Sequence, residues 1–114
     1  MYAITFCAQD LINDDAIQGF GIASDTIFAD RVAADEECKR LVDEHVNQMK
    51  ADYPEDENYS VEVEAPFKEA ETTEVIVMVY DAEPGFTKEA LQMTLFKVEQ
   101  IGQYLDSDGS YKLL

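Results

Sequence analysis

The chain has 114 residues, of which 46% are hydrophobic, and its 25 acidic residues against 8 basic residues give a formal net charge of −17 at pH 7. This length allows one domain, residues 1–114, and the hydrophobic content is too high for a disordered acidic tail. The charge excludes electrostatic binding to phosphate backbones or anionic lipids. Because His45 is the only histidine, Ser-His-Asp and Cys-His chemistry have little support, and we expect that the protein is not an enzyme.

The first half of the chain predicts two strands followed by a helix. Residues 2–9 place apolar side chains at every second position, which is strand periodicity. Residues 16–24 contain two glycines and suit a bulged second strand, with a short helix as the alternative. Asp30 is the expected N-cap of a clear helix that Pro54 ends. The apolar stripe of this helix consists of Ala34, Cys38, Leu41, Val42, His45, Met49 and Tyr53.

The second half predicts two more strands and a second helix. Residues 59–65 alternate cleanly, with glutamates on the solvent side. Residues 74–81 are apolar on both faces, which is typical of a central strand covered on both sides, or on one side by a partner. Thr87 is the expected cap of a second helix, and residues 111–114 are expected to add a short edge strand. The main stripe of the second helix is Leu91, Thr94, Leu95, Val98, Ile101 and Leu105.

The order of elements is therefore strand-strand-helix-strand-strand-helix, with an optional last strand. Interspersed strands and helices of this kind predict an α+β domain, an antiparallel sheet with two helices packed on one face. The second helix carries a further apolar row, Met93, Phe96 and Tyr104, although a helix that covers a sheet face needs only one row. We expect these three residues either to form a homodimer interface or to be covered by residues 10–29.

Several features bear on location and on bound groups. The N-terminal residues lack the basic region and cleavage site of a signal peptide, and the longest apolar run, residues 75–80, is too short to span a bilayer. Cys7 and Cys38 are expected to be small hydrophobic residues in a reducing compartment, so we expect a cytoplasmic protein. Residues 106–110 match the start of a calcium loop, but Tyr111 stands where such a loop needs glycine. We expect no metal and no cofactor.

The negative charge is concentrated in residues 52–83, which hold 11 acidic residues and one basic residue. Glu62 and Glu64, two apart on a strand, would lie about 6.6 Å apart along it. A row of such carboxylates has roughly the spacing of backbone phosphates, whereas the alternative is a solvated face with no partner. The expected partner-binding residues, with the two tyrosines as anchors, are Asp52, Tyr53, Glu55, Asp56, Glu57, Tyr59, Glu62, Glu64, Glu69, Glu71 and Glu74.

In size, charge and charge clustering, the chain resembles small acidic phage and mobile-element proteins that block nucleic-acid-handling defence enzymes. These include DNA-mimicking anti-restriction and anti-CRISPR proteins, and the resemblance covers no motif, so it assigns no role to any residue. It implies an inhibitor that docks its acidic surface on the basic nucleic-acid-binding site of a nuclease or effector protein. One alternative is an immunity or antitoxin protein that neutralises a basic nuclease. Another is a halophilic structural or binding domain, although six lysines against two arginines speak against strong halophilic adaptation.

Overall fold

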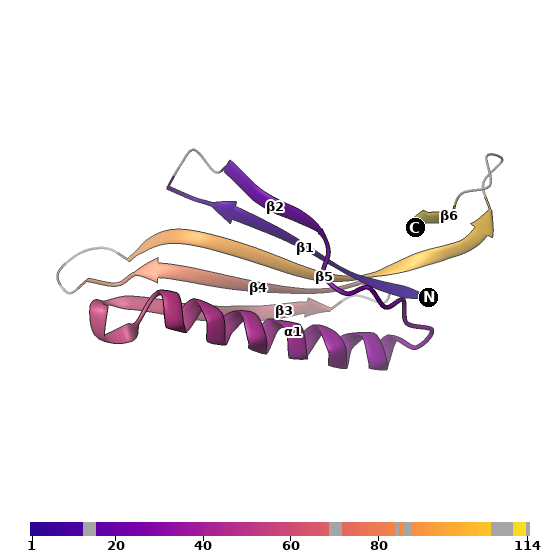
Figure 1. The fold of residues 1–114 in the computed structure, drawn as a ribbon, viewed down its shortest axis with the longest axis horizontal. Coiled ribbons are helices and arrows are strands. Elements are labelled where there is room, and N and C mark those ends of the chain that lie inside the picture. The colour runs from indigo at the N-terminus through magenta and orange to yellow at the C-terminus, as the bar shows by residue number, and fades with distance from the viewer. Residues whose placement is uncertain (13–15, 69–71, 84, 86–87, 106–110, 114) are drawn as a thin grey trace.

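The computed structural model describes residues 1–12, 16–68, 72–83, 85, 88–105 and 111–113. Its elements are β1 (Tyr2–Asp10), β2 (Ala16–Ile22), α1 (Arg31–Asp52), the short 3-10 helix η1 (Glu55–Glu57), β3 (Tyr59–Lys68), β4 (Thr72–Asp81), β5 (Glu89–Leu105) and β6 (Tyr111–Leu113). The strands form an antiparallel sheet in the order β2-β1-β5-β4-β3, and β6 pairs with the far end of β5. Helix α1 runs along one face of this sheet (Figure 1). No helix among the described residues is long and apolar enough to cross a membrane.

The predicted pair of helices is wrong, because residues 89–105 form strand β5 and α1 is the one α-helix of the described residues. Strand β5 is the centre of the sheet, with β1 on one side and β4 on the other. A central strand carries apolar residues on both faces, and such a run also fits a helical stripe. The backbone groups of β5 form hydrogen bonds with two neighbouring strands. These bonds come from the tertiary structure, so the local sequence of residues 89–105 does not reveal them.

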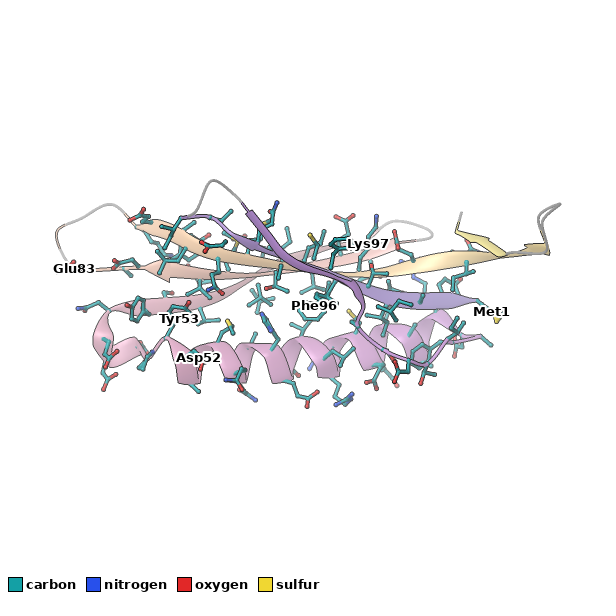
Figure 2. All side chains as sticks on the ribbon, turned by 45° about the horizontal axis from the view of Figure 1, so that its top comes forward. Met1, Asp52, Tyr53, Glu83, Phe96 and Lys97 are labelled. Carbon is teal, nitrogen blue, oxygen red and sulfur yellow. The ribbon has the colours of Figure 1, made fainter. Side chains whose placement is uncertain are left out.

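This correction also removes the argument for a homodimer interface made of Met93, Phe96 and Tyr104, which depended on a helical row. Three residues apart on a strand, Met93 and Phe96 lie on opposite faces. Phe96 is only 7% exposed and belongs to the core beneath α1. Figure 2 shows Phe96 between the sheet and the helix, with its neighbour Lys97 on the other side. The side chain of Tyr104 lies outside the described residues.

The other predicted elements are confirmed. Residues 16–22 form a strand rather than the alternative helix, and β1, β3, β4 and β6 match the expected strands within a few residues. Helix α1 begins after Asp30, whose Oδ1 accepts a hydrogen bond from the backbone N–H of Val32 at 3.0 Å. That carboxylate satisfies one of the N–H groups that lack a partner in the first turn of a helix. The predicted turn at residues 106–109 lies outside the described residues.

One hydrophobic core joins the helix to the sheet. Ala34, Cys38 and Val42 follow one another at intervals of four residues and form the buried row of α1. The sheet residues beneath this row come from β1, β4 and β5 and are Ile4, Val77, Phe96 and Val98. All three side chains of the helix row are at most 5% exposed, so this row is fully covered by the sheet.

The sheet face opposite α1, called the open face below, is covered by no helix of the described residues. The strand register places Cys7 beside Leu95, Leu95 beside Ile76, and Met93 beside Met78 on this face. The total accessible surface is 7373 Å², against about 6,300 Å² for a compact protein of this mass. The radius of gyration is 16.4 Å, against roughly 13 Å for a compact chain of this length. Covering only one sheet face therefore leaves an elongated molecule with excess surface.

Truncating a side chain on each face of β5 should destabilise the protein to different extents. Phe96→Ala should lower the free energy of unfolding by about 3–5 kcal/mol, because it leaves a cavity under α1. Met93→Ala, on the half-exposed open face, should cost less than about 2 kcal/mol. Urea denaturation followed by circular dichroism measures both changes, and equal losses would contradict the assignment of these residues to different faces.

Candidate functional site

A tight connection reverses the chain at the C-terminal end of α1. The backbone N–H of Tyr53 caps the helix by donating to the carbonyl of Met49 at 2.7 Å. Helix η1 follows and ends at Asn58, which has the left-handed φ of 67° that asparagine tolerates better than most residues. The carbonyl of Asn58 accepts a hydrogen bond from Ala82 at 2.8 Å. This bond ties the turn to the end of β4 and fixes its position on the sheet.

Tyr53 and Tyr59 flank this connection and contact each other. Their ring centroids lie 5.2 Å apart at an interplanar angle of 79°, an edge-to-face arrangement. The hydroxyl oxygen of Tyr53 accepts a hydrogen bond from Nε2 of Gln92 on β5 at 2.6 Å. Figure 2 shows Tyr53 between the helix and the sheet. The two predicted anchors therefore also hold the end of α1 against β3 and β5.

A hollow of about 890 Å³ opens beside this pair of tyrosines. Aromatic rings, carboxylates and backbone share its wall, and the lining residues are Lys50, Tyr53, Pro54, Glu55, Asp56, Asn58, Tyr59, Ser60, Val61 and Ala82. The hollow lies next to the C-terminus of α1, where the helix dipole adds partial negative charge. The lining combines two tyrosine rings with two carboxylates, Glu55 and Asp56, and one cation, Lys50, so its charge is negative on balance.

Seven carboxylates gather around this end of the molecule. Four of them, Asp52 and the three acids of η1, were predicted from the sequence, and all four are exposed. The fold adds Asp81, which pairs with Tyr59 and with Glu89 across the sheet, and Glu83 just beyond β4. The acidic end is defined here as Asp52, Glu55, Asp56, Glu57, Asp81, Glu83 and Glu89. None of the seven forms an ion pair with a lysine or arginine of the described residues.

The predicted binding residues did not include the last three of these acids, although Asp81 and Glu83 belong to the acidic segment 52–83 and the hairpin pattern pointed to Asp81. Residues 59–68 and 72–81 form a hairpin, so its open ends must lie together. Folding the sequence at the centre of that hairpin brings Asp81 beside Tyr59. The position of Glu89 depends on the pairing of β4 with β5, which the predicted second helix concealed.

The remaining predicted acids of the described residues do not form one continuous row of carboxylates with the acidic end. Glu62 and Glu64 point to the open face, as their alternation predicts, and both have partners there. Glu62 forms an ion pair with Lys88, whose Nζ lies 4.5 Å from the ring centroid of Tyr80. The Tyr80 hydroxyl donates to Glu64 Oε1 at 3.3 Å, and burial together with Glu64 raises the pKa of Tyr80. These carboxylates are bound into a network and are less available to a partner.

Glu74 is engaged in the same way, farther along the open face. Lys97 Nζ lies 3.8 Å from a carboxylate oxygen of Glu74 and 3.1 Å from one of Glu99. The hydrogen bond to Glu99 is the main reason that the pKa of Lys97 is raised. Glu69 and Glu71 lie outside the described residues.

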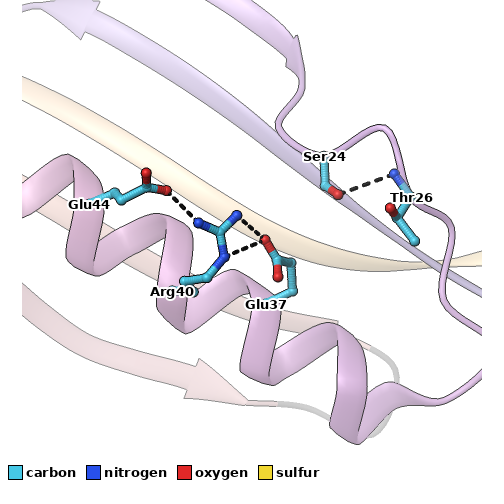
Figure 3. Close-up of polar contacts among 5 residues, drawn as sticks. All are labelled: Ser24, Thr26, Glu37, Arg40 and Glu44. Atoms are coloured by element: carbon cyan, nitrogen blue, oxygen red, sulfur yellow. Dashed lines mark hydrogen bonds and ion pairs between the residues drawn. The ribbon is translucent and has the colours of Figure 1, made fainter.

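The acids on the outer face of α1 are also partly neutralised. Arg40 forms ion pairs with Glu37 and, at 2.8 Å, with Glu44 (Figure 3). The hydrogen bond from Arg40 lowers the pKa of Glu37. Lys39 pairs with Asp43 at 3.3 Å. Most cations of the described residues are thus paired on the helix or the open face. Lys50, in the last turn of α1, is the cation that lies beside the acidic end, and no ion pair joins it to those seven acids.

The two cysteines and His45 are the side chains that could serve as nucleophiles, bases or metal ligands. Both cysteines are free thiols, and burial raises the pKa of Cys38 to about 11. His45 lies between the helix and the sheet, with Nε2 3.1 Å from Thr94 Oγ1 and its ring 5.5 Å from that of Phe96. In the described ranges, no three histidine, cysteine or carboxylate side chains are grouped so as to hold a metal ion.

Comparison with known proteins adds no relative: no protein-family model, no curated protein and no solved structure matches the chain.

His45 predicts that the protein loses stability on mild acidification. Burial lowers its pKa in the folded state, so below a pH of about 6.5 the unfolded chain takes up a proton that the folded chain resists. The free energy of unfolding should therefore fall between pH 7.5 and 5.5, by up to about 1.4 kcal/mol for each unit of pKa difference.

Urea titrations at the two pH values measure this change. The matched control is His45→Gln, which keeps a side-chain amide near Thr94 but cannot take up the proton. If the variant and the wild type lose the same amount of stability over this interval, His45 is not the group responsible.

Proposed function

We propose that this protein is an inhibitor that docks its acidic end onto a basic nucleic-acid-binding surface of another protein. The observation that carries the proposal is the acidic end, whose seven carboxylates form no ion pair with a lysine or arginine of the described residues and two of which, Glu55 and Asp56, line the hollow. A surface whose acids are already paired offers a basic partner little gain. Acids that are close together and lack cations can interact strongly with a complementary patch.

The geometry of the hollow suits an arginine or lysine side chain of the partner. Its cation would meet the carboxylates of Glu55 and Asp56, and its aliphatic stem would lie against the rings of Tyr53 and Tyr59. Aromatic faces attract such cations, and tyrosine is common among the residues that dominate protein interfaces. The hydrogen bond from Gln92 and the bond between Ala82 and Asn58 hold this surface in place before binding.

The uneven distribution of charge favours a binding role over the halophilic alternative. A domain adapted only to high salt needs acids over its whole surface, whereas here the helix and the open face hold compensating cations. A concentrated field speeds association by steering a basic partner toward one end of the molecule. The cytoplasm is the compartment we propose for this interaction, since both described thiols are free.

Neutralising the acidic end should slow association with the target. The test variant changes Asp52 and Asp56 to Asn and Glu55 and Glu57 to Gln. Its matched control changes four acids of α1, Glu36, Glu37, Asp43 and Glu44, to the corresponding amides, so that both variants have the same net charge. The association rate with a basic protein captured from a cell lysate should fall about ten-fold or more for the first variant and much less for the second.

Surface plasmon resonance at rising salt gives the rates, and a gel-shift assay shows whether the captured protein still binds nucleic acid. The proposal expects association to weaken steeply with salt, because the field is screened over about 10 Å at 0.1 M. It also expects the inhibitor to displace nucleic acid from the target. Equal losses in the two variants, or a target that binds nucleic acid and inhibitor together, would overturn it. A captured toxin nuclease would identify the inhibitor as an immunity protein with the same binding surface.

A further inference from the structure

The two edges of the sheet are protected to different degrees. Strand β3 forms one edge and carries Glu62 and Glu64, a register shift between Glu64 and Phe67, and Pro66. Charges, bulges and prolines on an edge strand oppose pairing with another chain. Strand β2 forms the other edge and also has a register shift, where Ala8 pairs with Gly19 and Gln9 with Ile17. Residues 16–24, however, contain no charged residue in a chain with a net charge of −17.

The edge at β2 is also where exposed apolar side chains gather. Phe20 is 76% exposed and Ile22 is 69% exposed. Ile12 and Ile27, on either side of β2 in the sequence, are 60% and 53% exposed. Four of the seven large hydrophobic residues that are exposed in the described part of the chain therefore lie within residues 12–27. Single exposed apolar residues are ordinary, but Phe20 and Ile22, two apart on one strand, share a face of an uncharged stretch, and this marks a contact surface. Asp14, Asp15 and Asp25 flank this stretch in the sequence.

The backbone of β2 is oriented for pairing. The N–H of Ala23 donates to the carbonyl of Ile4 at 2.8 Å, so it points toward β1. Because these groups alternate along an antiparallel strand, the N–H groups of Ile22 and Phe20 point away from β1. A Cβ added at Gly19 would lie 3.6 Å from the Phe6 ring, so that ring packs beneath β2 on the helix side. Strand β2 is thus held in an extended form, and no other described strand pairs with its outer side.

We propose that a second copy of this chain occupies this edge, with the two β2 strands paired antiparallel about a two-fold axis. An antiparallel pair of identical strands is self-complementary, as a two-fold dimer requires. The pairing would join the two sheets into one and bring the exposed Phe20 and Ile22 of both copies together on the joined face.

The distribution of charge selects a second copy over a basic partner. A basic protein gains nothing from an uncharged edge and is attracted instead to the acidic end. Two copies that each carry a charge of −17 repel one another except where both are uncharged. Strands β2 and β3 lie at opposite margins of the sheet, and Figure 1 shows α1 on the side of β3. Joining two molecules through β2 therefore keeps the acids of α1 and η1 on the outside.

Sedimentation equilibrium of the full chain across a range of concentrations tests this assembly. The proposal expects a dimer whose dissociation constant falls when NaCl is raised from 0.1 to about 0.5 M, because salt screens the repulsion between copies. This response is opposite in sign to that expected for the basic target. The failure of one proposal is therefore distinguishable from the failure of the other.

Matched variants locate the interface. Phe20→Glu should weaken dimerisation about ten-fold or more, because the axis places the new charge of one copy near that of the other. Val63→Glu, at a 49% exposed site on β3, adds the same charge and should leave the dimer intact. Circular dichroism of both variants checks the fold, and their exposed positions predict that both remain folded.

Hydrogen exchange of the backbone amides provides an independent measurement. In the dimer, the amides of Phe20 and Ile22 should exchange slowly at high protein concentration and faster on dilution. A monomer at every concentration and salt level would overturn the proposal. So would a dimer that Phe20→Glu leaves unchanged, or protection of these two amides only after a different protein is added.

Discussion

The contact between α1 and a single face of the sheet is the interaction on which the rest of this structure depends. Ala34, Cys38 and Val42 bring the helix close to the central strands, and burial of this seam is the main stabilising contribution. Three polar contacts accompany it: Arg31 to Thr73 near the start of the helix, His45 to Thr94 in the middle, and Tyr53 to Gln92 at its end. Together they align α1 along the sheet, so the position of the helix end, and of the acids beyond it, is determined by the core.

One helix cannot cover a five-stranded sheet on both faces, and the surplus surface has to be made compatible with water in other ways. On the open face, Lys88 and Lys97 pair with glutamates beside the exposed parts of Ile76, Met78 and Met93. At β3, charged residues and a bulge protect the edge. Strand β2 also has an irregularity, a register shift beside Ala8, but it carries no charged residue, and in this it differs from β3.

The distribution of charge also reflects the fact that one helix covers only one face of the sheet. Surface ion pairs contribute little stability individually, but they determine where the field of the protein emerges. The two arginines lie on α1, and Lys88 and Lys97 lie over the open face, so the connection from α1 to β3, with Lys50 as its neighbouring cation, keeps an excess of negative charge. Two kinds of association follow from these surfaces. One is electrostatic and weakened by salt, and the other is apolar, formed through the backbone and strengthened by salt.

Much of the architecture was determined by local sequence. Asp30 and Pro54 bound the first helix, the alternation in residues 59–65 sets the orientation of Glu62 and Glu64, and the run of acids in residues 52–57 is visible without any structure. These predictions held because capping, proline geometry and strand alternation act over a few residues.

Tertiary structure alone decided the state of residues 89–105 and the composition of the acidic end. The apolar residues of β5 fit a helix and a central strand equally well, and the choice came from hydrogen bonds to β1 and β4, which are distant in sequence. The same pairing put Phe96 in the core and brought Asp81 and Glu89 together. Local sequence thus determined where the charges and turns would be, whereas non-local strand pairing determined which of them share a surface.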